Sequence, residues 1–314
     1  MSAEPLATAP PTAGRLASSI GDTPLIELGP ALEGQVGAGV RVLVKAEWLN
    51  PGGSVKDRAA LSMLDRAAAD GRLRPGGVVL DASSGNTGIA LAMLSAARGY
   101  RLVICLPRNA SVERQRLLKA YGARIEYTSP LEGSDGAIRR ARELAALNTD
   151  WVYLDQYGNE ANWQAHFRGT GPEIWRQTAG SITHFVSCLG TSGTMMGVGR
   201  YLRSQSGRVQ LVAVQPDSPF HGIEGLKHME TALVPAIYDP GLPDMQLGAP
   251  TERAYEWCRR LAMLEGLLLG PSAAAAVWAA VEVGASLDHG VIVTIGRDGE
   301  NRYLSESHFL ESAC

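Results

Sequence analysis

The most informative reactive side chain in the sequence is Lys56, which follows a glycine-rich turn. Only four residues of the chain are lysines, so each lysine position invites a chemical reason. Lys56 ends the run Gly52-Gly53-Ser54-Val55-Lys56 and begins a helical pattern. An amine near the N–H groups of a helix N-terminus can have its pKa lowered enough to attack a carbonyl carbon. A Walker A loop has glycine where this chain has Val55, so the turn indicates either covalent amine catalysis or an ordinary solvated lysine.

A second polar turn follows the apolar run 78–82 and opens an alanine-rich helical segment. It reads Ser83-Ser84-Gly85-Asn86-Thr87-Gly88. Its glycines allow close backbone approach, and its hydroxyl, amide and backbone N–H groups are donors at a helix N-terminus. An ordinary N-cap needs only one or two such residues, so the turn predicts a cradle for a carboxylate.

A third turn, Gly190-Thr191-Ser192-Gly193-Thr194, also lies between a strand pattern and a helix pattern. Two glycines and three hydroxyl groups at the positive end of a helix suit a phosphate dianion. The alternative is a dinucleotide site, but the G-x-G-x-x-G spacing is missing and the next strand leads into Gln215 instead of an acidic residue.

A fourth turn, Gly270-Pro271-Ser272, precedes another alanine-rich helical pattern. Its serine fits a ligand contact and an ordinary N-cap equally well. Taken alone, this turn therefore decides nothing.

The elements that must position these turns alternate along the chain. Short apolar runs predict strands over residues 41–46, 78–82, 102–106, 124–127, 151–154, 184–188, 210–214 and 291–295. Helical patterns, several of them ended by glycine, cover residues 56–69, 89–97, 111–121, 137–147, 172–177, 195–204, 251–264 and 273–283. This alternation predicts an α/β fold with open sheets, which bind ligands at their strand-to-helix turns.

The composition argues against several classes of function. The 29 basic residues against 32 acidic ones leave a net charge of −3. Binding of nucleic acid or of an anionic membrane needs clustered Lys and Arg, so we expect neither and favour a small-molecule partner. The four cysteines lack metal-ligand spacing and the N-terminus lacks a signal pattern, which together predict a cytoplasmic protein without a metal. The apolar stretch 267–281 is interrupted by polar and helix-breaking residues, and residues 1–15 are expected to form a flexible tail.

The four turns, in this order and at these separations, resemble the fold-type II pyridoxal-phosphate enzymes. Among them they resemble the cysteine synthase (O-acetylserine sulfhydrylase) family, nearest to its B type. The resemblance extends from Gly21-Asp22-Thr23-Pro24-Leu25 to Asp298 and Arg302-Tyr303-Leu304-Ser305. It implies an α/β fold of two open twisted, mostly parallel sheets flanked by helices, like the tryptophan synthase β fold. It also implies a smaller mobile domain over residues 45–154 and a larger cofactor-binding domain over 16–44 plus 155–314.

The resemblance also implies roles for the residues of the four turns. In this family the lysine of the S-V-K-D-R motif carries pyridoxal 5'-phosphate as a Schiff base, which falls on Lys56. The asparagine that meets the cofactor's ring hydroxyl falls on Asn86, and the serine that faces the pyridine nitrogen falls on Ser272. The cofactor phosphate is implied to bind Gly190, Thr191, Ser192, Gly193 and Thr194. The substrate carboxylate is implied to bind Ser83, Ser84, Gly85, Thr87 and Gln156.

Three departures from the family pattern stand out. The chain has Ser83 where threonine is commoner, Ser192 where glycine is commoner, and alanines at 273–276 where a second serine and glycines are usual. None of them removes an implied catalytic group, and none indicates the sulfur donor.

The function implied is a β-replacement that makes L-cysteine from O-acetylserine and sulfide or another sulfur donor. The freed amine of Lys56 would act as general base. Because the Ser272 hydroxyl cannot keep the pyridine nitrogen protonated as a carboxylate does, elimination is expected in place of transamination. A homodimer is implied as well, and a complex with a serine acetyltransferase or a sulfur-carrier protein stays open.

Several alternatives to this function remain. O-phosphoserine is one alternative substrate, and Lys227, in the loop expected over the site, is hypothesised to bind its phosphate. Cystathionine β-synthase and serine or threonine dehydratase are the nearest enzyme alternatives. A different class of function is a non-catalytic protein that binds a partner in the cofactor cleft.

Overall fold

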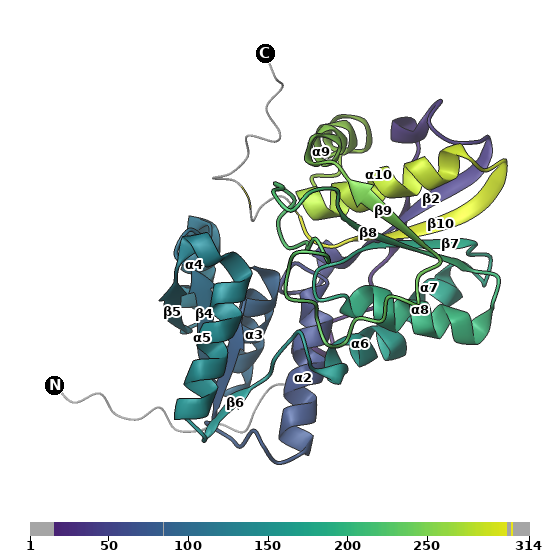
Figure 1. The fold of residues 1–314 in the computed structure, drawn as a ribbon. Coiled ribbons are helices and arrows are strands. Elements are labelled where there is room, and N and C mark those ends of the chain that lie inside the picture. The colour runs from purple at the N-terminus through teal and green to yellow at the C-terminus, as the bar shows by residue number, and fades with distance from the viewer. Residues whose placement is uncertain (1–15, 84, 300–302, 304–314) are drawn as a thin grey trace.

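The structure is a computed structural model that describes residues 16–83, 85–299 and 303. Within these residues two sheets lie side by side, each flanked by helices (Figure 1). The prediction of an α/β fold with two open, mostly parallel sheets is confirmed. No helix in the described part of the chain is long and apolar enough to cross a membrane.

The larger sheet has six strands in the order β1-β2-β10-β7-β8-β9, and only β1 runs antiparallel to its neighbour. Its strands are β1 (Leu25–Glu27), β2 (Gly39–Ala46), β10 (His289–Gly296), β7 (His184–Cys188), β8 (Gln210–Pro216) and β9 (Met245–Ala249). Side chains alternate between its two apolar faces. One face packs on α9 (Thr251–Glu265) and α10 (Pro271–Ala285), and the other on α7 (Gly171–Gln177) and α8 (Gly193–Gln205).

Helix α10 lies close beneath the larger sheet because its first turns are built from alanine. The four alanines at 273–276 are all fully buried. Methyl side chains let a helix approach a sheet more closely than larger apolar residues do. This departure from the family pattern therefore belongs to the packing of the core.

The smaller sheet has four parallel strands in the order β5-β4-β3-β6. They are β5 (Arg124–Thr128), β4 (Arg101–Pro107), β3 (Val78–Ala82) and β6 (Trp151–Tyr153). One face packs on α2 (Lys56–Ala69), α3 (Asn86–Arg98) and α4 (Val112–Ala120), and the other on α5 (Gly133–Leu147). Helix α6 (Glu160–Ala165) supplies Ala161 to the first of these cores and Trp163 to the core of the larger sheet.

All the strands and helices expected from the sequence are present, with ends shifted by a few residues. The sequence patterns missed β1, β9, α6 and the short helices: the 3₁₀ helices η1 (Pro30–Leu32), η2 (Glu47–Leu49) and η3 (Pro130–Glu132), and the π-helix η4 (His166–Thr170). Strands β1 and β9 are edge strands with few buried residues, so they lack the apolar run that marks a central strand.

The expected domain boundary at residue 45 falls inside a strand of the larger sheet. Lys45 and Ala46 end β2 and pair with Ile295 and Gly296 of β10. The chain therefore leaves the larger sheet after Ala46. The division into a small mobile and a large domain stays a prediction.

Candidate active site

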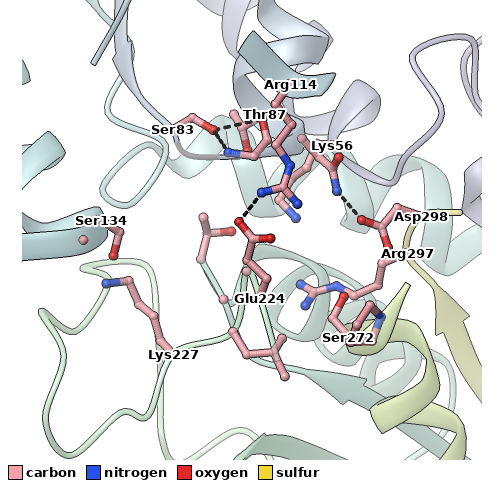
Figure 2. A pocket seen from close by; sticks show the side chains of 18 of the residues that line it. Lys56, Ser83, Thr87, Arg114, Ser134, Glu224, Lys227, Ser272, Arg297 and Asp298 are labelled. Carbon is pink, nitrogen blue, oxygen red and sulfur yellow. Dashed lines mark hydrogen bonds and ion pairs between the residues drawn. The ribbon is translucent and has the colours of Figure 1, made fainter. Parts of the chain in front are cut away.

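The turns that follow β3, β7 and β10 meet in a cavity of about 610 Å³ between the two sheets. Parallel strands present their carboxyl ends at one edge of a sheet, so turns from distant segments come together there. Ten residues singled out from the sequence line this cavity: Lys56, Ser83, Gly85, Asn86, Thr87, Gln156, Gly190, Thr191, Lys227 and Ser272. Figure 2 shows several of these side chains pointing into the common space. Ser84 lies outside the described residues.

Lys56 is the first residue of α2, and its amine faces the cavity. Burial of the amine and, to a lesser extent, the nearby charge of Arg297 lower the pKa of Lys56 to about 7, against the opposing effect of Asp298. The N–H of Gly52 donates to the Asp57 carboxylate at 2.5 Å, and a Cβ on Gly52 would overlap that carboxylate. Lys56 therefore lies in the cavity, as covalent amine catalysis requires, and its role as the cofactor lysine stays a prediction.

The turn after β3 presents donors at the start of α3. The Ser83 hydroxyl oxygen accepts from the Gly88 N–H at 2.9 Å and from the Gly85 N–H at 3.3 Å, so this side chain shapes the turn. Thr87 Oγ1 donates to Gln156 Oε1 at 2.7 Å, and Gln156 Nε2 donates to the Ala82 carbonyl at 2.5 Å. Gln156, which follows β6, is thus fixed beside the turn, and its contact with the substrate carboxylate stays a prediction.

The turn after β7 contains a buried hydroxyl group that lacks a partner in the described chain. Ser192 has a left-handed backbone, with φ +67°, at the N-cap of α8, and its Oγ atom makes no hydrogen bond there. Gly190 and Thr191 line the cavity, while Ser192, Gly193 and Thr194 are buried at the helix start. A helix N-terminus with an unpaired hydroxyl fits the phosphate of a cofactor.

Close packing around this turn explains its glycines. A Cβ on Gly193 would overlap the side-chain oxygen of Asn162, and one on Gly190 would overlap the Gly225 carbonyl oxygen. Asn162 Nδ2 donates to Thr191 Oγ1 at 3.1 Å and to the Gln156 carbonyl at 2.7 Å. The turn is therefore held to the segment that carries Gln156.

Ser272 lies in the first turn of α10, whose N-cap is Gly270. Its side chain lines the cavity and the residue is 4% exposed. The alternative that Ser272 is an ordinary N-cap is therefore wrong. The residue is available to a ligand in the cavity.

Asp298 and Arg297 also line the cavity. The family resemblance includes Asp298 without a role and does not mark Arg297, although both residues follow β10, and the carboxyl ends of parallel strands are where ligands bind. Asp298 Oδ2 accepts from Asn86 Nδ2 at 2.6 Å and from Tyr303 Oη at 2.7 Å. The amide of Asn86 thus contacts the opposite sheet through Asp298.

Two ion pairs cross the mouth of the cavity. Arg114 of α4 pairs with Glu224, and Lys227 Nζ lies 3.0 Å from Asp135 Oδ1 of α5 (Figure 2 shows the first pair). Lys227 is 5% exposed and lies over the ring of Tyr157 at 5.1 Å. It is therefore a buried, paired cation and not a solvated loop lysine. No local sequence signal marks Arg114, because its partner is more than a hundred residues away.

Comparison with known proteins decides the family. The model of the pyridoxal-phosphate dependent enzymes matches residues 16–298. A cysteine synthase of Aquifex aeolicus is 48% identical over 295 residues, covering 92% of this chain and 90% of the relative. This chain belongs to the cysteine synthase family. Cysteine synthase B of Escherichia coli is 42% identical, with 95% of this chain and 98% of the relative covered.

Solved structures of several activities resemble this cysteine synthase family member. An O-ureido-L-serine synthase shares 37% identity at a TM-score of 0.88, covering 95% of each chain. The cysteine synthase of Entamoeba histolytica shares 34% identity at a TM-score of 0.88, covering 96% of this chain and 93% of that chain. An O-acetylserine dependent cystathionine β-synthase of Helicobacter pylori shares 30% identity at a TM-score of 0.87, covering 92% and 96%.

The cofactor of this family is pyridoxal 5'-phosphate, and the residues of the cavity fit it. The amine of Lys56 can take the aldehyde, and the unpaired Ser192 hydroxyl at the α8 N-terminus can take the phosphate. Within the described residues, no cluster of His, Cys, Asp and Glu is arranged to hold a metal ion.

Proposed function

We propose that this enzyme makes L-cysteine by β-replacement on an activated serine, with O-acetylserine as the first candidate and sulfide or another sulfur donor as the nucleophile. The observation that carries the proposal is that Lys56, Ser272 and residues of both polar turns line one cavity: Ser83, Gly85, Asn86 and Thr87 from the first turn, and Gly190 and Thr191 from the second. Relatives named cysteine synthase cover nearly the whole chain and support it.

Each group of residues has a separate task in this reaction. When bound, pyridoxal phosphate supplies an electron sink for the loss of the α-proton and the β-substituent. The turn at the start of α3 binds the substrate carboxylate through its N–H and hydroxyl donors, with Gln156 held beside Thr87. This contact fixes the α-carbon near the amine of Lys56.

The amine of Lys56 serves as the general base. With its pKa lowered to about 7, a substantial fraction of the amine is neutral at neutral pH and can accept the α-proton. The same amine returns the proton after sulfur has added to Cβ. The proton therefore stays at one atom, Nζ, through both halves of the reaction.

The proposal is tested by product analysis. The purified enzyme, loaded with cofactor, is given O-acetylserine with sulfide, thiosulfate or homocysteine, and products are identified by mass spectrometry. We expect L-cysteine from O-acetylserine and sulfide. Lys56→Ala is the inactive control, since loss of a general base costs about 10²–10⁴ in rate.

The alternatives give different products in the same experiment. Predominant cystathionine from homocysteine would indicate a cystathionine β-synthase. A 2-oxo acid and ammonia from serine or threonine would indicate a dehydratase. Failure to turn over any amino acid, with cofactor bound, would indicate the non-catalytic alternative.

A second substrate, O-phosphoserine, is favoured by the burial of Lys227 inside the cavity. Its ammonium already pairs with Asp135, so a phosphate would share this cation with that carboxylate. Lys227→Ala should lower kcat/KM for O-phosphoserine about tenfold or more, equivalent to ~1.4 kcal/mol, with little effect on O-acetylserine. The matched control is Lys119→Ala on α4, whose side chain is exposed. An unchanged ratio of the two specificity constants contradicts this second proposal.

We also propose that the enzyme works as a homodimer in the cytoplasm. The cysteines among the described residues, Cys105, Cys188 and Cys258, are buried and form no disulfide with one another, which suits a reducing compartment. Light scattering after size-exclusion chromatography tests the dimer, and a monomer at micromolar concentration would contradict it.

A further inference from the structure

Arg297 is a buried cation that lacks a protein partner in the described part of the chain. It lines the cavity and is 5% exposed, and its Nε atom is buried there without a hydrogen bond. The other buried cations Lys45, Arg58, Arg114 and Lys227 each pair with a carboxylate. A guanidinium is costly to bury without an acceptor, so Arg297 is suited to an acceptor that binds in the cavity.

The position of Arg297 is fixed between the segments that carry Lys56 and Ser272. Its carbonyl accepts from the Val55 N–H at 2.9 Å, next to Lys56. The following residues form two isolated β-bridges, one with Ser54 before Lys56 and one with Leu269 before Ser272. In Figure 2 the guanidinium extends into the pocket on the side of Ser272.

The cofactor offers several acceptors, and most of them are already served by other turns. The phosphate has the N-terminus of α8 and the Ser192 hydroxyl, and the substrate carboxylate has the N-terminus of α3. The ring hydroxyl oxygen is expected at Asn86. The pyridine nitrogen lies across the ring from the carbon that reacts with the lysine amine. Since the resemblance implies that Ser272 faces this nitrogen, the nitrogen would lie on the Ser272 side of the cavity.

We propose that Arg297 donates a hydrogen bond to the pyridine nitrogen of the cofactor, beside Ser272, and holds that nitrogen unprotonated. A guanidinium donates an N–H but keeps its proton, and its charge repels a second proton from the ring. An unprotonated ring draws less electron density from the substrate, which favours elimination over transamination. The inference rests on the proposed cofactor site and adds a cofactor-binding residue to it.

The experiment measures the protonation state of the pyridine nitrogen directly. The enzyme and its Arg297→Gln variant are loaded with pyridoxal phosphate labelled with ¹⁵N in the ring, and ¹⁵N spectra are recorded from pH 6 to 9. The parent enzyme should show an unprotonated nitrogen throughout this range. Arg297→Gln should show a nitrogen whose signal moves toward the protonated position as the pH falls.

Two further variants keep the result decisive. Arg297→Lys retains a positive charge, so its ¹⁵N signal should stay that of an unprotonated nitrogen. If Arg297→Gln fails to fold, the signal of this second variant still tests whether a positive charge at position 297 keeps the nitrogen unprotonated. Arg253→Gln, an exposed arginine on α9, should change nothing. A protonated nitrogen in the parent enzyme, or identical pH behaviour in Arg297→Gln, overturns the proposal.

The other possible acceptors give distinct outcomes. A change in the ³¹P signal and a tenfold weaker cofactor affinity, with the ¹⁵N signal unchanged, would assign Arg297 to the phosphate and overturn the proposal. A raised KM of Arg297→Gln with unchanged cofactor spectra would assign Arg297 to the substrate carboxylate and would also overturn the proposal. If the enzyme binds the cofactor but makes no cysteine, the proposed function fails while the nitrogen measurement still decides the role of Arg297.

Discussion

At the scale of single residues, the lowered pKa of Lys56 has a consequence for the pH dependence of the reaction. Below about pH 7 the freed amine is protonated and cannot take the α-proton, so kcat should fall as the pH drops through this value and level off above it. The measurement is kcat for O-acetylserine between pH 5.5 and 9.

Arg297 provides the control for this pH profile. Its charge is one cause of the lowered pKa of Lys56, so Arg297→Gln should move the midpoint of the profile upward. A profile that stays flat between pH 6 and 8 in the parent enzyme would show that Lys56 is not the titrating base.

Asp81, at the end of β3, is predicted to make the folded protein less stable as the pH rises. Its Oδ1 accepts from the Ala82 N–H at 2.8 Å, and burial raises the pKa of Asp81 to about 8, far above the ~3.9 of an unfolded chain. Between these two values the unfolded chain binds fewer protons than the folded one, so stability decreases with rising pH by at most about 1.4 kcal/mol per unit.

Asp81→Asn tests this pH dependence because it has the same shape and no titrating proton. The variant should lose this decrease in stability, so its advantage over the parent grows between pH 5 and pH 8. Urea unfolding at both pH values measures the difference. An equal pH dependence of the two proteins would assign the effect to other groups.

At the scale of elements, the start of α8 depends on the absence of a side chain at position 193. Gly193→Ala places a methyl group against Asn162, which holds Thr191 and the Gln156 carbonyl. We expect cofactor affinity to fall about tenfold or more, ~1.4 kcal/mol, because the phosphate turn must shift. A fluorescence titration with pyridoxal phosphate measures it.

The matched control is Gly207→Ala, in the loop after α8, where an added Cβ meets nothing within 4 Å. This variant should bind the cofactor as the parent does. Equal affinities of Gly193→Ala and the parent would show that the turn tolerates the methyl group.

The elements also explain how far the sequence could predict the fold and the site. Central strands such as β3 and β7 are buried on both faces and therefore appear in the sequence as apolar runs. Glycines mark the ends of several helices. These elements and the turns after them were therefore predictable from the sequence. Strand β9 lies at an exposed edge and leaves no such run. Arg114 and Asp298 were missed as site residues because their partners, Glu224 and Asn86, are remote in sequence.

At the scale of the whole molecule, several polar contacts join the two sheets across the cavity. Asn86 contacts Asp298, and the ion pairs Arg114–Glu224 and Lys227–Asp135 cross the mouth. If the smaller sheet moves as proposed, a bound carboxylate analogue of the substrate should make the molecule more compact. Small-angle scattering with and without the analogue measures the radius of gyration.

The ion pairs allow a control for this movement. Arg114→Gln removes one pair and should give a larger radius of gyration with the analogue bound, whereas Arg253→Gln on the outer surface should not. Identical scattering curves with and without the analogue would contradict closure.

The position of β10 in the larger sheet has a consequence for the synthesis of the chain. This strand, residues 289–296, pairs with β2 on one side and with β7 on the other. A nascent chain can therefore complete the smaller sheet from residues 78–153 long before the larger one. Until β10 leaves the ribosome, β2 and β7 each expose an unpaired edge, which is where a half-made chain is open to chaperones and to aggregation.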